Sequence, residues 1–203
     1  MWLESFKFDG FLRYCMDCII VHGCPSNTEK ATDPIKRTYD KHWIPWVKRE
    51  LEKKGITTEV PIMPTAWEPV YSEWKAVFDQ MNITKDTVLI GHSCGCAFLV
   101  RWLGDTQRTI ATLVLVAPWK IPPKNNMKKK LFYEYSVDST INQRVKNILI
   151  FTADNEVADG KKSAELFHSA LGGTIIVLKG RGHYTFDDMG TEAFPEILEE
   201  LLL

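Results

Sequence analysis

The stretch that most constrains the fold is Gly91-His92-Ser93-Cys94-Gly95, which joins two apolar segments of different periodicity. Residues 87–90, just before it, are mostly β-branched or aliphatic, as in a buried strand, and the apolar residues after it recur at helical spacing through Leu103. A Gly-x-Ser-x-Gly pattern between a strand and a helix predicts a sharp turn that lifts the serine hydroxyl clear of the sheet. The glycines suit this turn because strand and helix approach closely around it. We therefore expect Ser93 to be an accessible nucleophile.

The rest of the chain alternates short apolar runs with segments of helical period. Strands are expected at 17–21, within 56–63, and at 87–90, 110–116, 147–152 and 174–178. Helices are expected at 43–51, at 67–81, from the serine turn through 103, around 127–135, in a segment that includes 164–171, and at 194–202. Because the strands lack polar alternation, both faces of the sheet should be covered. The pattern predicts an α/β fold with a mainly parallel sheet between helices.

Length and charge set the domain organisation and the classes of partner. The 203 residues predict one domain over 16–203, preceded by an N-terminal extension at 1–15. With 25 basic and 26 acidic residues, the net charge of −1 gives no field that favours nucleic acid or an anionic membrane. No apolar run approaches the roughly 18–20 residues of a membrane span, and charged residues interrupt the N-terminal aromatics where a signal peptide would need an apolar core. We expect a cytoplasmic protein, and nothing indicates a protein partner.

The five cysteines include a Cys15-x-x-Cys18 spacing that could indicate a redox or zinc pair. Cys18, however, opens the apolar strand at 17–21, and no second such pair or nearby pair of histidines completes a tetrahedral zinc set. We therefore expect no metal site and no cofactor. In a cytoplasmic protein the thiols should be reduced.

Three residues that follow predicted strands form a candidate catalytic set: Ser93, Asp154 and His183. The carboxyl ends of parallel strands lie at one edge of a sheet, so these residues can converge there. A serine needs a base to take its proton and an acid to orient that base, and the order Ser, Asp, His is that of α/β-hydrolases. Gly180 and Gly182 flank the His183 loop and allow it to turn tightly. We predict His183 as the base and Asp154 as the acid.

Other carboxylates and histidines compete for these roles. Asp159 is expected to cap the next helix, and Asp187 and Asp188 both follow His183 in the chain. Glu156 is expected to face solvent. Surface or structural roles are expected for three of the histidines outside the candidate set: His42, His92 and His168.

Acyl transfer also requires two backbone amides that face the developing oxyanion. One should belong to Cys94, directly after the nucleophile, and the other to Cys24 in the loop after the first strand. Substrate-lining aromatic residues are proposed in the segment at 117–144, although core packing is the alternative interpretation of each. These are Trp119, Tyr133 and Tyr135.

From about Met16 to Leu203 the chain resembles the small α/β-hydrolases grouped around retinoblastoma-binding protein 9 and the bacterial YdeN-like proteins. The resemblance rests on Ile19-Ile20-Val21-His22-Gly23, Trp43-Ile44-Pro45-Trp46-Val47-Lys48-Arg49-Glu50-Leu51, Met63-Pro64, Gly91-His92-Ser93-Cys94-Gly95, Asp154-Asn155-Glu156-Val157 and Gly182-His183-Tyr184. It implies a single-domain α/β-hydrolase fold without a large lid, and a triad of Ser93, Asp154 and His183. Residues 1–15 lie outside the pattern, and the loop at 26–41 is long for it.

The leading hypothesis is a serine hydrolase that cleaves esters of small to medium acyl groups through an acyl-enzyme intermediate. Amides and thioesters are alternative substrates of the same chemistry. The alternative from another class is a catalytically silent protein that keeps the fold and binds protein partners. That alternative is weaker because such a scaffold would be expected to have lost at least one of the three candidate residues.

Overall fold

A six-stranded parallel sheet forms the centre of the computed structural model, which describes residues 17–202. The strand order is β2-β1-β3-β4-β5-β6, and every neighbouring pair is parallel. The bounds are β1 Asp17–Val21, β2 Thr57–Glu59, β3 Val88–His92, β4 Ile110–Val116, β5 Val145–Ala153 and β6 Thr174–Leu178. The predicted α/β class with a parallel sheet is therefore confirmed. The predicted extension at 1–15 lies outside the described residues.

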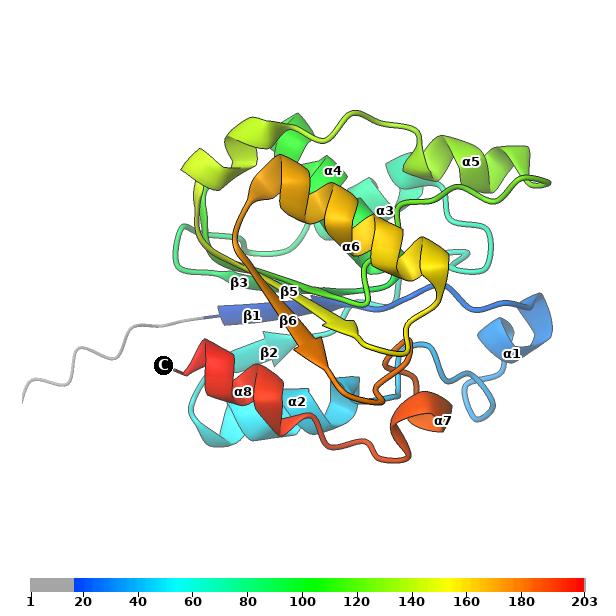
Figure 1. The fold of residues 1–203 in the computed structure, drawn as a ribbon, viewed down its shortest axis with the longest axis horizontal. Coiled ribbons are helices and arrows are strands. Elements are labelled where there is room, and N and C mark those ends of the chain that lie inside the picture. The colour runs from blue at the N-terminus through cyan, green and yellow to red at the C-terminus, as the bar shows by residue number, and fades with distance from the viewer. Residues whose placement is uncertain (1–16, 203) are drawn as a thin grey trace, which may run out of the picture.

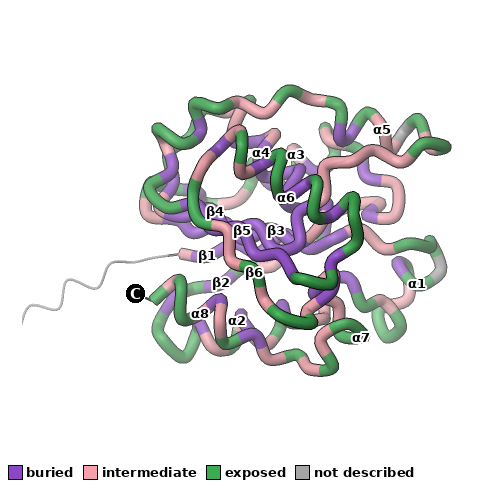
Figure 2. Tube along the Cα trace, in the orientation of Figure 1, coloured by how far each residue is buried: buried purple, intermediate pink, exposed green. Residues whose placement is uncertain are grey.

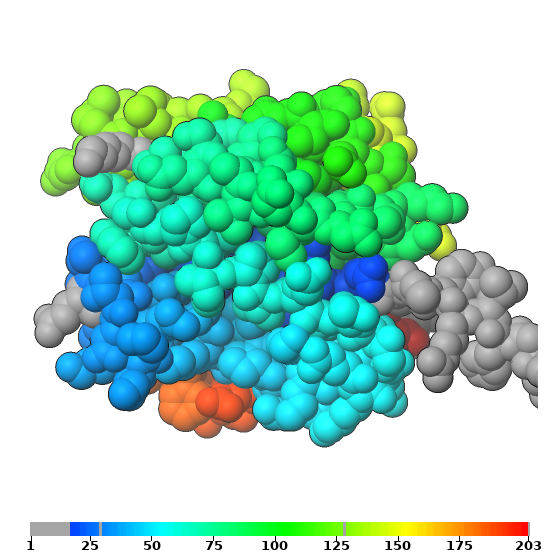
Figure 3. All heavy atoms as spheres, turned by 180° about the vertical axis from the view of Figure 1, so that it is seen from behind, coloured from blue at the N-terminus to red at the C-terminus, as the bar shows by residue number. Residues whose placement is uncertain are grey.

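Helices cover both faces of this sheet (Figure 1). The α-helices are α1 Thr28–Thr32, α2 Ile44–Lys53, α3 Tyr71–Phe78, α4 Cys94–Thr106, α5 Met127–Tyr133, α6 Ala158–Leu171, α7 Phe186–Met189 and α8 Pro195–Leu201, with a 3-10 helix η1 at Ser139–Gln143. Figure 1 shows α3, α4 and α6 on one face, and α2 and α8 on the other. From behind (Figure 3), the segment containing α1 and α2 covers the lower part of the molecule and the segment containing α3 and α4 the upper part.

The two faces of the sheet bury separate apolar clusters. On the α3, α4 and α6 face, the rings of Trp74 and Phe98 meet edge to face with their centroids 5.4 Å apart. On the α2 and α8 face, Trp43 and Phe194 meet in the same way at 5.5 Å. The central strands are buried between these clusters (Figure 2). This double burial accounts for the absence of polar alternation in the strands.

Two features depart from the sequence-based expectation. Helix α3 begins at Tyr71 rather than near residue 67, because Pro69 lacks an amide hydrogen and disfavours helical backbone at the residue before it. Three short helices, α1, η1 and α7, lie in segments where none was expected. Both α1 and α7 belong to long connections that follow the carboxyl ends of strands.

The loops that follow β1, β3, β5 and β6 leave the sheet at the same edge because all these strands run in parallel. Ser93 follows β3, residues 154–157 follow β5, and His183 follows β6. Within residues 17–202, no helix combines the length and the apolar character that crossing a membrane requires.

Gly95 provides a test of the close packing at this edge. A Cβ atom at Gly95 would overlap the carbonyl oxygen of Val21 and lie 2.7 Å from that of His22. We expect Gly95→Ala to lower the free energy of unfolding by about 1–3 kcal/mol, measured by urea denaturation. The control is Gly104→Ala on the same helix, where the nearest atom, Asp138 Cβ, is 3.3 Å away. It should change stability by less than about 1 kcal/mol, and equal losses in both variants would contradict the prediction.

Candidate active site

Ser93 occupies the predicted turn between β3 and α4. Its backbone has φ 52° and ψ −118°, a conformation that L-residues rarely adopt. The conformation is held from both sides, since the Ser93 amide donates to the Val116 carbonyl at 3.0 Å and the Ser93 carbonyl accepts from the Cys96 amide at 3.1 Å. A Cβ at Gly91 would lie 2.8 Å from the Cys96 backbone. The glycines are thus required by close packing around the serine.

His183 lies between Ser93 and a carboxylate. Its Nε2 atom is 2.8 Å from Ser93 Oγ, and its Nδ1 atom is 2.8 Å from Glu156 Oε2. A carboxylate at Nδ1 fixes the proton on that nitrogen, which leaves Nε2 free to accept the serine proton. The predicted approach of Ser93 and His183 is therefore present in the structure. The carboxylate that completes the line is not the predicted one.

The prediction that Asp154 orients His183 is wrong, and so is the prediction that Glu156 faces solvent. The side chain of Glu156 is only 1% exposed, and its second oxygen accepts from the Val157 amide at 2.8 Å. Strand β5 continues to Ala153, so Asp154 falls on the exposed turn that follows. Its Oδ1 atom accepts from the Gly180 amide at 2.7 Å, and Asp154 therefore supports the loop that carries His183.

Helix α6 makes room for the buried glutamate. A Cβ at Gly160 would lie 2.6 Å from Cδ of Glu156, so the carboxylate passes over a helical residue that has no side chain. The glycine, four residues after the glutamate, is a sequence signal that could have identified the acid. Of the competing aspartates, Asp159 lies in the first turn of α6, and Asp188 accepts the His183 amide at 2.9 Å. Asp187 lies exposed in α7.

Two further histidines form hydrogen bonds to the backbone of the segment that carries His183. His92 Nε2 is 2.9 Å from the His183 carbonyl, to which it donates, and His42 Nδ1 accepts from the Phe186 amide at 3.0 Å. Burial is the main cause that lowers the pKa of both imidazoles, that of His92 far below its usual value. Both rings are therefore neutral at pH 7 and act through hydrogen bonds. The remaining candidate, His168, lies in the last turn of α6.

The expectation of reduced thiols is wrong for two cysteines, because Cys24 and Cys94 form a disulfide with their Cα atoms 5.9 Å apart. They are the two residues predicted to supply the oxyanion amides. Gly23 lies against the nucleophile, since a Cβ there would be 3.2 Å from Ser93 Cβ. Among the described residues, neither the Cys24 nor the Cys94 amide donates to a backbone carbonyl. Both amides are thus beside Ser93 and available to a bound group.

The three predicted pocket aromatics differ in position. Trp119 places its ring edge to face with His183, with centroids 5.5 Å apart, and its backbone amide donates to the Ser93 carbonyl. Tyr133 lies in the apolar cluster on the α4 face, and the Tyr135 hydroxyl donates to the Ala97 carbonyl at 2.7 Å. No ring contact or hydrogen bond joins either tyrosine to Ser93 or His183 in this described region. Only Trp119 is placed against the catalytic groups.

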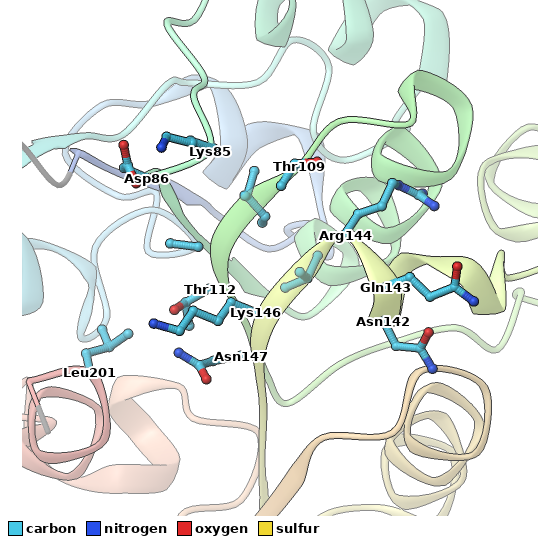
Figure 4. A pocket seen from close by; sticks show the side chains of 13 residues that line it. Lys85, Asp86, Thr109, Thr112, Asn142, Gln143, Arg144, Lys146, Asn147 and Leu201 are labelled. Carbon is cyan, nitrogen blue, oxygen red and sulfur yellow. The ribbon is translucent and has the colours of Figure 1, made fainter.

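A hollow of about 670 Å³ lies at the opposite edge of the sheet (Figure 4). It is lined by the amino ends of β4 and β5 and by the turn before β3, with Lys85, Arg144 and Lys146 among its residues. None of the residues around Ser93 contributes to it, and ligands of open parallel sheets bind at the carboxyl edge. Over residues 17–202 no cluster of three or more histidines, cysteines or acidic residues could hold a metal ion.

Several known proteins resemble this chain in sequence and in fold. The family model described as "Serine hydrolase" matches residues 35–202. The YdeN protein of Bacillus subtilis (strain 168) is 22% identical over 169 residues, which cover 79% of this chain and 86% of YdeN. The crystal structure of the B. subtilis ydeN gene product matches with a TM-score of 0.78 at 19% identity, covering 92% of this chain and 97% of that one. Est1E of Butyrivibrio proteoclasticus matches with a TM-score of 0.62 at 16% identity, covering 93% and 88%. The predicted YdeN-like resemblance is confirmed.

The pH dependence of stability should report the buried imidazole that fixes the loop before Cys24. His22 Nδ1 donates to the Gly23 carbonyl, Nε2 accepts from the Met63 amide, and burial lowers the His22 pKa to about 4. Below pH 6.5, His22 is protonated in the unfolded chain, whereas in the folded protein it remains neutral down to about pH 4. Stability is therefore lost as the pH falls between these values. We expect His22 to contribute a loss of roughly 3 kcal/mol between these values.

Urea denaturation at pH 7, 5.5 and 4.5 measures this loss. The variant His22→Asn should be less stable at pH 7 but should lose less stability on acidification. An unchanged pH slope in the variant would contradict the assignment.

Proposed function

The chain belongs to the serine hydrolase family, and on that premise we propose that it hydrolyses carboxylic esters of small to medium acyl groups through a Ser93–His183–Glu156 triad. The observation that carries the proposal is the continuous line of hydrogen bonds from Ser93 Oγ through both nitrogens of His183 to Glu156, with 2.8 Å at each step. A serine hydroxyl is a weak nucleophile at neutral pH, and this line supplies the base that it needs.

In the acylation step, Ser93 Oγ attacks the ester carbonyl carbon while its proton passes to His183 Nε2. The imidazolium that forms is stabilised by Glu156, whose buried carboxylate accepts from Nδ1. His183 then gives the proton to the departing alcohol oxygen, and the acyl group remains on Ser93. In the second half, His183 takes a proton from water, the resulting hydroxide attacks the acyl carbon, and the proton returns to Ser93 as the acid leaves.

The negative charge that develops on the carbonyl oxygen requires donors beside Ser93. We assign this role to the backbone amides of Cys94 and Cys24. Cys94 opens the 13-residue helix α4, whose first amides have no partner within the helix and whose positive dipole end faces the site. Cys24 is held beside it by the disulfide. A preorganised pair of this kind stabilises the tetrahedral intermediate more than its substrate.

The acyl group is proposed to lie against Trp119, the ring that contacts His183. The segment between β4 and β5 contributes only the short helices α5 and η1, which cannot form a separate domain over the site. Est1E, which shares the fold, has a solved structure with ferulic acid bound. A planar aromatic acyl group can pack against an indole ring, so esters of aromatic acids are included among the proposed substrates. Amides and thioesters are secondary candidates.

If the protein were a catalytically silent scaffold, the hydrogen bonds that join Ser93, His183 and Glu156 would be expected to be disrupted. The buried carboxylate, the correctly placed imidazole and the strained serine backbone all favour an active enzyme instead, because such strain persists only where the surroundings enforce it. The proposed partner is a small acyl substrate. The proposed reaction uses only side chains, amides and water.

The nucleophile and base can be tested together. We expect the wild-type protein to react with a fluorophosphonate probe and to hydrolyse short-chain p-nitrophenyl esters. Ser93→Ala and His183→Ala should each lower kcat/KM by about a thousandfold or more, and Ser93→Ala should abolish labelling. A folded wild-type protein that neither labels nor turns over any of these esters would overturn the enzyme assignment and favour the scaffold.

The identity of the acid can be tested with two isosteric substitutions. Glu156→Gln should lower kcat by about 10³- to 10⁴-fold, because an amide next to Nδ1 can hold the wrong tautomer of His183. Asp154→Asn keeps an oxygen that can accept from the Gly180 amide, so kcat should change by less than about threefold. The opposite ranking of the two variants would restore Asp154 as the acid.

A further inference from the structure

The Cys24–Cys94 disulfide joins the two segments to which the oxyanion amides belong. Cys24 lies three residues after the end of β1, and Cys94 directly follows Ser93, 70 residues further along the chain. The cross-link therefore ties a loop to the amino end of the helix that carries the nucleophile. Among the described residues, this disulfide is the bond of the site that thiol reagents can reduce or re-form.

The other described cysteines are unsuited to such chemistry. Cys18 and Cys96 are free and buried, and burial raises the pKa of both thiols well above the usual value. A buried neutral thiol is a poor nucleophile and a poor target. Thiol exchange in the described part of the chain is thus confined to the pair beside Ser93.

The two cysteines of the pair differ in exposure. Cys24 is partly exposed, whereas Cys94 is 1% exposed. An incoming thiolate is therefore expected to attack Cys24, the more exposed of the two, which makes Cys94 the leaving group. Cys94 is the first residue of α4, so the sulfur that leaves is the one at the amino end of that helix. Access to the attacked sulfur is one of the factors that set the rate of thiol–disulfide exchange.

Cys24 lies where the loop after β1 passes from buried to exposed residues. His22 and Gly23 are buried and held by the hydrogen bonds of the His22 ring, whereas Ser26, Asn27 and Thr28 are exposed. Cys24 lies at the boundary between these parts. Without the cross-link, Cys24 would lose its covalent tie to the amino end of α4.

We propose that Cys24–Cys94 is a reversible thiol–disulfide site whose oxidised form holds the oxyanion amides in place and whose reduced form is the slower enzyme. This inference rests on the proposed ester hydrolysis. The reductant is a low-molecular-weight thiol, RSH. Its thiolate attacks Cys24 Sγ, a mixed disulfide forms, and Cys94 leaves as a thiolate and takes a proton. A second RSH attacks the mixed disulfide, which releases RSSR and leaves both protein cysteines as thiols. Two electrons thus pass from the two RSH to the protein disulfide. Oxidised RSSR drives the same sequence in reverse.

The expected effect is on the chemical step. Removing one oxyanion donor typically lowers kcat by 10²- to 10³-fold, and loosening one donor should have a smaller effect. We expect full reduction to lower kcat by about ten- to a hundredfold and to change KM by less than about threefold.

The experiment equilibrates the full-length protein in mixtures of reduced and oxidised glutathione, or of reduced and oxidised dithiothreitol at lower potentials. One half of each sample is acid-quenched, alkylated and analysed by peptide mass mapping for the Cys24–Cys94 cross-link. The other half is assayed with a p-nitrophenyl ester, with Ser93→Ala in the same buffer as the blank for hydrolysis by free thiol. The proposal expects kcat to follow the cross-linked fraction.

Two variants separate this effect from general damage. Cys24→Ala combined with Cys94→Ala keeps both backbone amides and should turn over at the reduced rate in every buffer. Cys18→Ala removes a thiol outside the pair and should keep the full redox response. If the double variant does not fold, the dependence of kcat on the cross-linked fraction in the wild-type protein tests the proposal by itself.

Three results would overturn the proposal. The first is turnover that stays constant while the cross-linked fraction changes, which would leave the proposed hydrolase intact. The second is failure of the Cys24–Cys94 cross-link to form in the most oxidising mixture. The third is a cross-link that forms normally in a protein without turnover or fluorophosphonate labelling at any potential, which would remove the proposed function as well.

Discussion

The amino end of α4 approaches the carboxyl end of β1 so closely that a side chain at residue 95 would overlap the Val21 carbonyl. This approach places the loop after β1 directly beside Ser93, where Gly23 lies against the serine Cβ. The strained backbone of Ser93 is tolerated because the buried strands around it fix both its amide and its carbonyl. The site is therefore a consequence of how tightly one helix packs on the centre of a parallel sheet.

The polar groups at the carboxyl edge divide into two sets. Asp154, Asn155 and Asp188 accept backbone amides from the loop at 180–183 and so fix its path. Glu156, by contrast, hydrogen-bonds to the imidazole ring itself, and it does so from a buried position. The loop is thus oriented by exposed side chains at its periphery, whereas the proton-transfer geometry is set by a carboxylate shielded from water.

Much of the fold and part of the site could be predicted from the sequence. The strands of unbroken apolar residues and the Gly-x-Ser-x-Gly turn depend on local pattern, and chain order alone was enough to pair Ser93 with His183. The identity of the acid depends instead on where β5 ends and on the space over Gly160. Neither can be read from the number of residues between a predicted strand and a carboxylate. The disulfide was missed because Cys24 and Cys94 are neighbours only through the packing of α4 on β1.

The space above Gly160 links the acid to a position that never touches the imidazole. Any larger residue there would meet the Glu156 carboxyl carbon, which lies 2.6 Å from the point that a Cβ atom would occupy. A larger residue at 160 would therefore require the glutamate side chain to shift from the position in which it meets His183 Nδ1. The geometry of proton transfer thus depends on the size of a side chain that belongs to the helix covering the acid.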